Sequence, residues 1–258
     1  MDIKAIFLDI DNTFFDHTSN RVLPETIEAC KTAKQNGYKV VLCSGRPKEM
    51  ADQLEVFDMV DWDGYIGCTG ALVLDENYEC IHHDAFSEQQ LEEIFSLAKK
   101  HDLTIYSFGK YEFITRPLDD YSRKIALDFH LSLPEVRTWN KEELSAISVL
   151  GDKELTRKIF ENIENISITS TTRYANDFIR SDVDKARGIR FLMNHWGYEE
   201  GAYLAFGDSL NDIEMIKDAK IGIVMGNGSD QIKECADIIC GNANEPSIYN
   251  MLKKLQII

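Results

Sequence analysis

Positive charge is scarce in this sequence. Lysine and arginine together number 28 against 44 aspartates and glutamates, which leaves a formal net charge of −16. A nucleic-acid partner normally needs a basic face on the protein, so this balance argues against such a partner. An anionic substrate would need local help, either from a metal ion or from a few well-placed cations.

Long apolar runs and paired cysteine motifs are also absent. No run approaches the roughly 20 residues that span a bilayer, and the opening MDIKAIFLDI lacks the basic start and cleavage site of a signal peptide. The six cysteines form no CxxC pair, and several lie in apolar runs such as VVLCS, where free cysteine behaves as a small buried hydrophobe. We therefore expect a reduced, cytoplasmic protein without membrane contact, disulfides or structural zinc.

The N-terminal part alternates compact apolar runs with helix signals. Hydrophobic residues make up 44% of the chain, an ordinary globular composition. The helix signals include Pro24 at a start and Gly37 at a stop. The strand-like runs are 3–9, 38–45 and 64–70, and the helices that follow the first two are 24–37 and 46–57. This order predicts right-handed βαβ units and a parallel sheet whose strands are buried on both faces.

The C-terminal part returns to the same alternation, but the middle of the chain does not. Predicted C-terminal helices are 185–197, 210–219, 229–236 and 245–255, and predicted strands are 202–208, 220–226 and 237–240. The middle has adjacent strands (103–109 with 111–116, and 166–172 with 175–181), a further strand at 145–151, helices at 87–101 and 153–164, and a polar helix-forming stretch after 116. We predict an α/β fold. Residues 1–82 and 179–258 form a Rossmann-like doubly wound parallel sheet, and an α+β domain, 83–178, is inserted into it.

Polar clusters follow the predicted core strands. In FLDIDNTFFD, Asp9 and Asp11 come directly after the first strand. SGRP, residues 44–47, follows the second strand, and GDSLND, residues 207–212, follows a C-terminal one, while Lys185 opens a helix. Ligands of doubly wound sheets bind at the carboxyl ends of the strands, so these clusters are expected to meet.

The spacing of Asp9 and Asp11 suits a metal ion and phosphoryl transfer. Two unpaired carboxylates so close would repel each other unless a cation lay between them. Hard carboxylate oxygens are ligands that Mg²⁺ accepts, so Asp9 and Asp208 are natural ligands. Asp9 could also attack phosphorus, and Asp11 could protonate the leaving alkoxide and then deprotonate water.

The remaining clusters suit the transferred phosphoryl group. Ser44 offers a hydroxyl, and Gly45 lets backbone N–H groups approach a phosphoryl oxygen. Lys185 supplies a compact positive charge. Arg46 is expected either to contact substrate or to anchor its helix. Asn211 and Asp212 are expected to orient ligands. The alternative for Asp212 is that it only stabilises the start of a helix through the helix dipole.

Each signal has a simpler reading. A D-x-D pair also occurs in the metal site of some sugar-nucleotide transferases, or in a solvated turn. Ser44 could be only a helix N-cap. Lys153 and Lys158 are alternative candidates to Lys185 for the lysine that faces the phosphoryl group. The pair His82–His83 could suggest a metal site, but adjacent strand residues face opposite sides, which favours an ordinary surface at a domain junction.

The four clusters, in this order, resemble the motifs of the haloacid dehalogenase (HAD) superfamily of aspartate-nucleophile phosphatases. D-x-D-x-T corresponds to residues 9–13, the Ser/Thr motif to Ser44, the lysine to Lys185 and G-D-x-x-N-D to residues 207–212. A domain inserted between the second and third motifs, with VMGN and ADII near the end, resembles the Cof-like, type IIB branch. In that branch the inserted domain is a cap, and the resemblance covers essentially the whole chain.

Two positions depart from the family pattern. Asn12 stands where relatives commonly have glycine, and asparagine tolerates a positive φ better than most residues. Thr69-Gly70-Ala71 stands where the branch often has Asn-Gly-Ala, so a ligand contact of that asparagine is not carried over to this chain.

Residues and resemblance together predict Mg²⁺-dependent hydrolysis of small phosphate monoesters, such as sugar phosphates or phosphorylated cofactors, through an aspartyl-phosphate on Asp9. A phosphomutase or phosphotransferase, or a non-catalytic ligand-binding module, are the alternatives. The predicted catalytic residues are Asp9, Asp11 and Lys185, the substrate and phosphate contacts are Ser44, Gly45, Arg46 and Asn211, and the Mg²⁺ ligands are Asp9, Asp11, Asp208 and Asp212.

Overall fold

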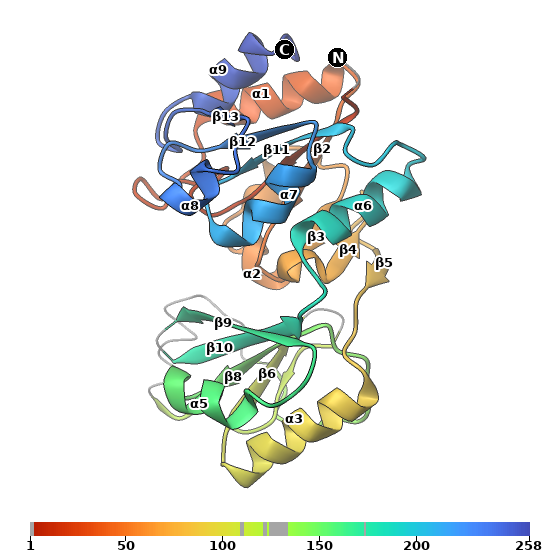
Figure 1. The fold of residues 1–258 in the computed structure, drawn as a ribbon, viewed down its shortest axis with the longest axis vertical. Coiled ribbons are helices and arrows are strands. Elements are labelled where there is room, and N and C mark those ends of the chain that lie inside the picture. Colours follow the sequence, from red (N-terminus) through yellow and green to blue (C-terminus); the bar gives the residue numbers. More distant parts are fainter. Residues whose placement is uncertain (1–2, 109–110, 121–122, 124–133, 173) are drawn as a thin grey trace. The chain divides into compact units, whose positions relative to one another are not determined.

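The computed structural model describes residues 3–108, 111–120, 123, 134–172 and 174–258. The chain forms two compact units, each with its own core (Figure 1). The first unit comprises residues 1–46, 51–82 and 184–258, and the second comprises 47–50 and 83–183. In the described parts of the chain, none of the helices combines the length and apolar character that a membrane span requires.

The first unit is built on an eight-stranded sheet in the order β13-β12-β11-β1-β2-β3-β4-β5. From β13 to β3 neighbouring strands run parallel, and β4 is antiparallel to β3. Its strands are β1 (Ala5–Leu8), β2 (Lys39–Cys43), β3 (Tyr65–Gly67), β4 (Leu72–Leu74), β5 (Cys80–His83), β11 (Tyr203–Gly207), β12 (Ile221–Val224) and β13 (Ile238–Ile239). The chain runs outward from β1 through β2 to β3 and later returns to β11 on the other side of β1. The sheet therefore has its switch in strand order at β1, where doubly wound folds bind ligands.

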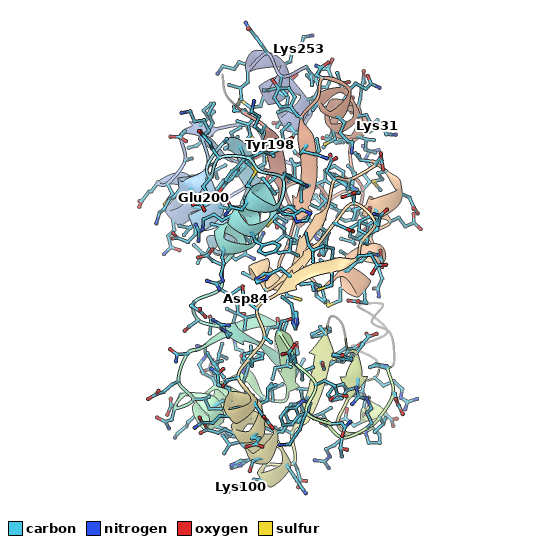
Figure 2. All side chains as sticks on the ribbon, turned by 90° about the vertical axis from the view of Figure 1, so that its right-hand side faces the viewer. Lys31, Asp84, Lys100, Tyr198, Glu200 and Lys253 are labelled. Atoms are coloured by element: carbon cyan, nitrogen blue, oxygen red, sulfur yellow. The ribbon has the colours of Figure 1, made fainter. Side chains whose placement is uncertain are left out.

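Burial explains why the central strands read as continuous apolar runs. Every residue of β1 and of β11 is buried, because helices cover both faces of the sheet (Figure 1). Helices α6 and α7 pack together on one face, and α1 and α9 pack together on the other. The helices are α1 (Pro24–Gln35), α2 (Lys48–Asp52), α6 (Lys185–His195), α7 (Ile213–Asp218), α8 (Asp230–Lys233) and α9 (Ser247–Lys254). Charged side chains such as Lys31, Glu200 and Lys253 point outward from this unit (Figure 2).

The predicted helix 46–57 is shorter in the structure. It ends with α2 at Asp52, and a separate 3-10 turn, Val56–Asp58, follows. Glu55 between them has φ 54°, a left-handed conformation that an α-helix cannot contain. Strands β4 and β5 were not predicted. Both are short, and helix or strand is hard to assign to such runs from periodicity.

The second unit holds a five-stranded antiparallel sheet in the order β7-β6-β8-β10-β9. Its elements are α3 (Glu88–Lys100), β6 (Thr104–Phe108), β7 (Phe113–Ile114), β8 (Ala146–Leu150), α5 (Lys153–Phe160), β9 (Ile166–Thr172) and β10 (Ala175–Arg180). Helices α3 and α5 pack on the same face of this sheet (Figure 1). Ser87 caps α3 through a capping box with Gln90, and Asp152 caps α5. The polar helix-forming stretch predicted after residue 116 lies largely outside the described residues.

Helix α7 packs closely against the core sheet at Gly222 in β12. A Cβ built there would lie 2.2 Å from the carbonyl oxygen of Ile216 in α7, so only glycine fits without a backbone shift. We expect Gly222→Ala to lower the free energy of unfolding by about 1–3 kcal/mol, the usual cost of overpacking. Urea denaturation followed by circular dichroism measures this change. An unchanged midpoint would show that α7 is free to move away from the strand.

Candidate active site

The loop after β1 places Asp9 at the carboxyl edge of the core sheet. The backbone N–H of Asp9 donates to the carbonyl of Phe206 in β11 (2.9 Å), which continues the parallel pairing by one residue. The loop then turns sharply, with the N–H of Phe14 donating to Asp9 O and that of Asn12 to Phe15 O. Asn12 has φ 57°, a left-handed conformation that asparagine tolerates better than most other residues with a side chain.

Lys185 is completely buried between two carboxylates. Its Nζ lies 2.6 Å from Asp9 Oδ1 and 2.5 Å from Asp212 Oδ1. Lys185 is the first residue of α6, and the preceding Asp184 caps that helix by accepting from the N–H of Arg187. The competing candidates Lys153 and Lys158 lie on α5 in the second unit. The structure thus brings Lys185 to the predicted nucleophile.

Burial and neighbouring charges shift the protonation of this cluster. Burial raises the pKa of Asp9 well above its usual value. The Lys185 ammonium opposes that rise, and the Asp212 charge adds to it. Burial alone would lower the pKa of Lys185, but Asp212 and Asp9 outweigh it and raise that pKa. The lysine therefore stays protonated and shields the repulsion between the two carboxylates.

Asp212 organises the loop that follows β11. Its Oδ2 accepts from the backbone N–H groups of Asp208 and Ser209, both at 3.0 Å, while its Oδ1 accepts from Lys185. The carboxylate packs so closely that a Cβ on Gly207 would lie 2.6 Å from Asp212 Cγ. The glycine of this motif is therefore a packing requirement. Asp212 holds both the loop and the lysine in place.

Three carboxylates are close enough to share a metal ion. Asp9, Asp208 and Asp212 each offer an oxygen, and these atoms lie within 4.8 Å of one another. Burial and the Asp212 charge raise the pKa of Asp208 to about 7, the mark of a carboxylate without sufficient positive charge nearby. A hard divalent cation would supply that charge through oxygen ligands, so this donor set fits such an ion.

The Asp11 carboxylate is not in that group of three and faces other partners. Arg46 Nε donates to both of its oxygens (3.1 and 2.8 Å) and Nη2 donates to Oδ1 (2.8 Å). His17 Nε2 lies 2.5 Å from the same Oδ1. Burial alone would raise the pKa of Asp11, but the hydrogen bonds and charge of Arg46, with those of His17, lower it. We expected Arg46 to contact substrate or to anchor its helix. In the structure it forms hydrogen bonds and an ion pair with Asp11.

The predicted phosphate contacts gather at the end of β2. Ser44 is fully buried, and its Oγ accepts from the N–H of Arg46 at 3.1 Å, which leaves its hydroxyl proton free to donate elsewhere. A Cβ on Gly45 would lie 3.3 Å from Asn211 Nδ2, so the amide of Asn211 faces this loop. Asn211 Oδ1 accepts from the hydroxyl of Ser209.

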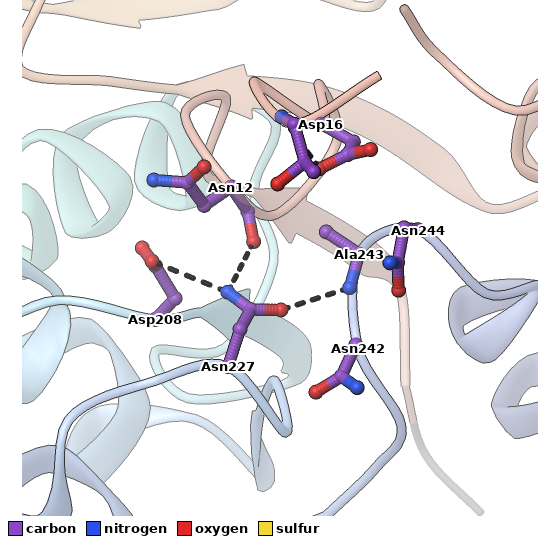
Figure 3. A pocket seen from close by; sticks show the side chains of 8 residues that line it. Asn12, Asp16, Asp208, Asn227, Asn242, Ala243 and Asn244 are labelled. Atoms are coloured by element: carbon purple, nitrogen blue, oxygen red, sulfur yellow. Dashed lines mark hydrogen bonds between the residues drawn. The ribbon is translucent and has the colours of Figure 1, made fainter. Parts of the chain in front are cut away.

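Two side chains at this site, His17 and Asn227, were not predicted from the sequence. Asn227 Nδ2 donates to the carbonyl of Asn12 (2.8 Å) and lies 3.5 Å from Asp208 Oδ2, and its Oδ1 accepts from the N–H of Ala243 (Figure 3). A pocket of about 300 Å³ lies here, and it is lined by Asn12, Asp16, Thr18, Asp208, Asn227, Asn242, Ala243 and Asn244. Asn227 belongs to the VMGN run, so that run was its one available signal. Nothing in the sequence indicates that His17 reaches Asp11.

Comparison with known proteins agrees with this geometry. Residues 6–252 match the model of a family described as haloacid dehalogenase-like hydrolases. The chain belongs to this family. Such hydrolases generally use a divalent metal ion, which is consistent with the acidic cluster at Asp9.

Individual relatives span the whole hydrolase. It is 26% identical to the 5-amino-6-(5-phospho-D-ribitylamino)uracil phosphatase YcsE of Bacillus subtilis, covering 98% of this chain and 96% of that protein. The structure of the HAD phosphatase BT1666 from Bacteroides thetaiotaomicron is similar, with a TM-score of 0.84 and 26% identity over 99% of this chain and 96% of that one. The subclass IIB sugar phosphatase BT4131 gives a TM-score of 0.82 and 25% identity, over 99% and 100% of the two chains.

Replacing the buried lysine tests the charge balance of the site. We expect Lys185→Met to lower the free energy of unfolding by about 3–5 kcal/mol near neutral pH, because two buried carboxylates lose their cation. The loss should shrink at lower pH, where those carboxylates are protonated. Urea denaturation at several pH values measures it. The exposed Lys217→Met is the control and should change stability little. Equal effects of the two variants would contradict the assignment.

The raised pKa of Asp208 predicts a pH-dependent metal affinity. Because Asp208 titrates at about 7, it binds a cation as a carboxylate above that pH and must release a proton below it. With Mg²⁺ as the probe, we expect the affinity to fall about tenfold per pH unit below pH 7 from this group alone. Isothermal titration calorimetry in two buffers of different ionisation enthalpy counts the released protons. An affinity that stays flat from pH 8 to pH 6 would refute the prediction.

Proposed function

We propose that this hydrolase is a Mg²⁺-dependent phosphatase that cleaves small phosphate monoesters through an aspartyl-phosphate on Asp9. The observation that carries the proposal is the buried contact of Lys185 with Asp9 and Asp212, beside the unneutralised Asp208. A purely structural ion pair would not need a third carboxylate beside it. A site for a divalent cation does need further carboxylate oxygens, and those of Asp9, Asp208 and Asp212 lie within 4.8 Å of one another.

Asp9 is positioned to act as the nucleophile. Lys185 holds its Oδ1, and among the described residues no hydrogen bond engages Oδ2, so that oxygen is free to attack. In the first half-reaction an Asp9 oxygen bonds to phosphorus, the bond from phosphorus to the leaving oxygen breaks, and Asp11 donates a proton to that oxygen. In the second, Asp11 accepts a proton from water, whose oxygen bonds to phosphorus, and phosphate leaves Asp9.

The contacts of Asp11 suit the second half-reaction directly. Arg46 and His17 hold it as a carboxylate, which is the form that accepts a proton from water. For the first half-reaction Asp11 must carry a proton, and that requires a weaker hold by Arg46. A phosphoryl group bound at Ser44–Arg46 offers the guanidinium another anionic partner. We therefore propose that substrate binding redirects Arg46 and allows Asp11 to become protonated.

Asp9 and Asp208 are the residues that would hold Mg²⁺, with Asp11 and Asp212 as the further predicted ligands. When bound, the cation would neutralise charge on the phosphoryl oxygens and on the carboxylates. Both oxygens of Asp212 already accept hydrogen bonds, so we assign it mainly to orienting Asp208 and Lys185. Lys185, the Ser44 hydroxyl and the Gly45 backbone would bind the phosphoryl oxygens.

Small metabolites are the proposed substrate class. The inserted unit would act as a cap that excludes bulk water and selects the leaving group, which favours sugar phosphates or phosphorylated cofactors over polymers. Relatives named as a sugar phosphatase and as a phosphatase of a ribitylaminouracil phosphate support this class. Transfer of phosphate to a second hydroxyl, or ligand binding without chemistry, would be the alternatives if hydrolysis is not observed.

Replacing the nucleophile tests the mechanism. With Mg²⁺ and a panel of small phosphate monoesters, we expect the native protein to release phosphate and Asp9→Asn to lose about 10³-fold or more of that rate. The side chain of Asp61 is fully exposed, so Asp61→Asn is the matched control and should keep native activity. Acid-quenched native protein should also carry phosphate that Asp9→Asn lacks. Equal activity of Asp9→Asn and native protein would exclude Asp9 as nucleophile.

A further inference from the structure

The turn after β3 adopts a strained backbone. Cys68 has φ 52° and Thr69 has φ 55° and ψ 35°, both in the left-handed region, and Gly70 follows with φ 100°. A β-branched residue rarely occupies that region because its side chain crowds the backbone. Such strain persists only where the surrounding structure imposes it, and it concentrates at functional sites.

The elements that impose this conformation are the two that carry the proposed phosphate contacts. The N–H of Cys68 donates to the carbonyl of Arg46 (3.1 Å), and that of Thr69 donates to the carbonyl of Ser44 (3.0 Å). On the other side, a Cβ on Gly70 would lie 1.9 Å from the carbonyl oxygen of Asp184, the residue before Lys185. The turn is therefore held between the loop of Ser44 and the start of the lysine helix.

Thr69 is the residue of this turn whose side chain reaches solvent. Cys68 and Gly70 are buried, whereas Thr69 is half-buried. Its hydroxyl faces the loop: a Cβ on Gly45 would lie 3.4 Å from Thr69 Oγ1 and 3.3 Å from Asn211 Nδ2. Within the described part of the chain, no hydrogen bond engages the Thr69 hydroxyl. A strained turn thus presents one free hydroxyl beside the backbone of Gly45, next to an amide.

We propose that Thr69 is a substrate-binding residue whose hydroxyl donates to an oxygen of the transferring phosphoryl group above Gly45. The proposal rests on the proposed phosphatase function and adds a contact to it. If the turn mattered only as backbone, glycine or asparagine would fit position 69 with less strain. Threonine retains a donor at the cost of that strain, and the amide of Asn211 offers a second donor beside it.

Thr69→Val is the sharpest test, because valine keeps the β-branched shape and the backbone strain but loses the donor. The probe is inorganic phosphate, whose binding to the Mg²⁺-loaded protein is measured by calorimetry and as inhibition of p-nitrophenyl phosphate hydrolysis. We expect Thr69→Val to weaken phosphate binding about tenfold, as for loss of a hydrogen bond to a charged group. KM should rise with it. Thr69→Ser keeps the hydroxyl and should stay within about twofold of the native protein.

Phosphate binding that is the same in Thr69→Val and native protein would overturn the proposal, even if both hydrolyse substrate normally. Absence of hydrolysis by the native protein would instead count against the proposed function, and phosphate binding would still test Thr69. If the valine variant does not fold, Thr69→Ala takes its place with the same expectation. Equal weakening by the serine variant would assign Thr69 a structural role and overturn the contact.

The strain itself has a separate readout. Thr69→Asn should raise the thermal midpoint by roughly 2–4 °C, because asparagine occupies the left-handed region more readily. Glu55→Asn is the matched control, since Glu55 has φ 54° outside the site contacts described above. It should raise the midpoint similarly and leave phosphate binding unchanged. A lower thermal midpoint for Thr69→Asn would show that the backbone of Thr69 is not strained.

Discussion

A lysine ammonium buried between two aspartates is the interaction on which the rest of this site depends. Lys185, Asp9 and Asp212 come from three distant parts of the chain, and none of the three side chains is appreciably exposed. Removing these charges from water is costly, and their mutual attraction compensates only when the geometry is good. The cluster is acidic by one charge, and Asp208 adds a second. A bound divalent cation would neutralise that excess of negative charge.

The parallel sheet brings these groups together. Because β1, β2 and β11 run side by side in the same direction, the loops that follow them emerge at one edge. Asp9, Ser44 and Asp208 are the first polar residues beyond those strands, and the switch in strand order at β1 opens space between the loops. Lys185 reaches the same edge because Asp184 caps α6 and fixes where that helix begins. Close packing at Gly207 and Gly70 then locks the loops against their neighbours.

In the proposed mechanism, Arg46 links proton transfer to phosphate binding. The guanidinium grips Asp11, while the backbone of the same residue ties Ser44 to Tyr65 and Cys68. A change in the Ser44–Arg46 loop would therefore reach Asp11, the proposed general acid and base. His17 adds a second hold on Asp11 from the turn that follows it in the chain. The carboxylate at position 11 thus differs from that at position 9 because its partners are a half-buried arginine and an exposed histidine, whereas Asp9 faces a fully buried lysine.

The sequence by itself determined the α/β core and the inserted α+β segment, and it singled out the residues that we propose carry the chemistry. Buried strands read as continuous apolar runs, and chemistry demands particular residue types at their ends, so local pattern suffices for Asp9, Ser44 and the 207–212 motif. The early end of α2 and the strands β4 and β5 were not predicted, because short elements depend on contacts that are remote in sequence.

Only the tertiary structure decided that Lys185, not Lys153 or Lys158, meets Asp9, and that Arg46 and His17 hold Asp11. It also decided the left-handed turn at Thr69, since its partners lie on the loop of Ser44 and at the start of α6. Contacts between individual side chains depend on how loops from distant segments pack, and local residue patterns do not specify that packing.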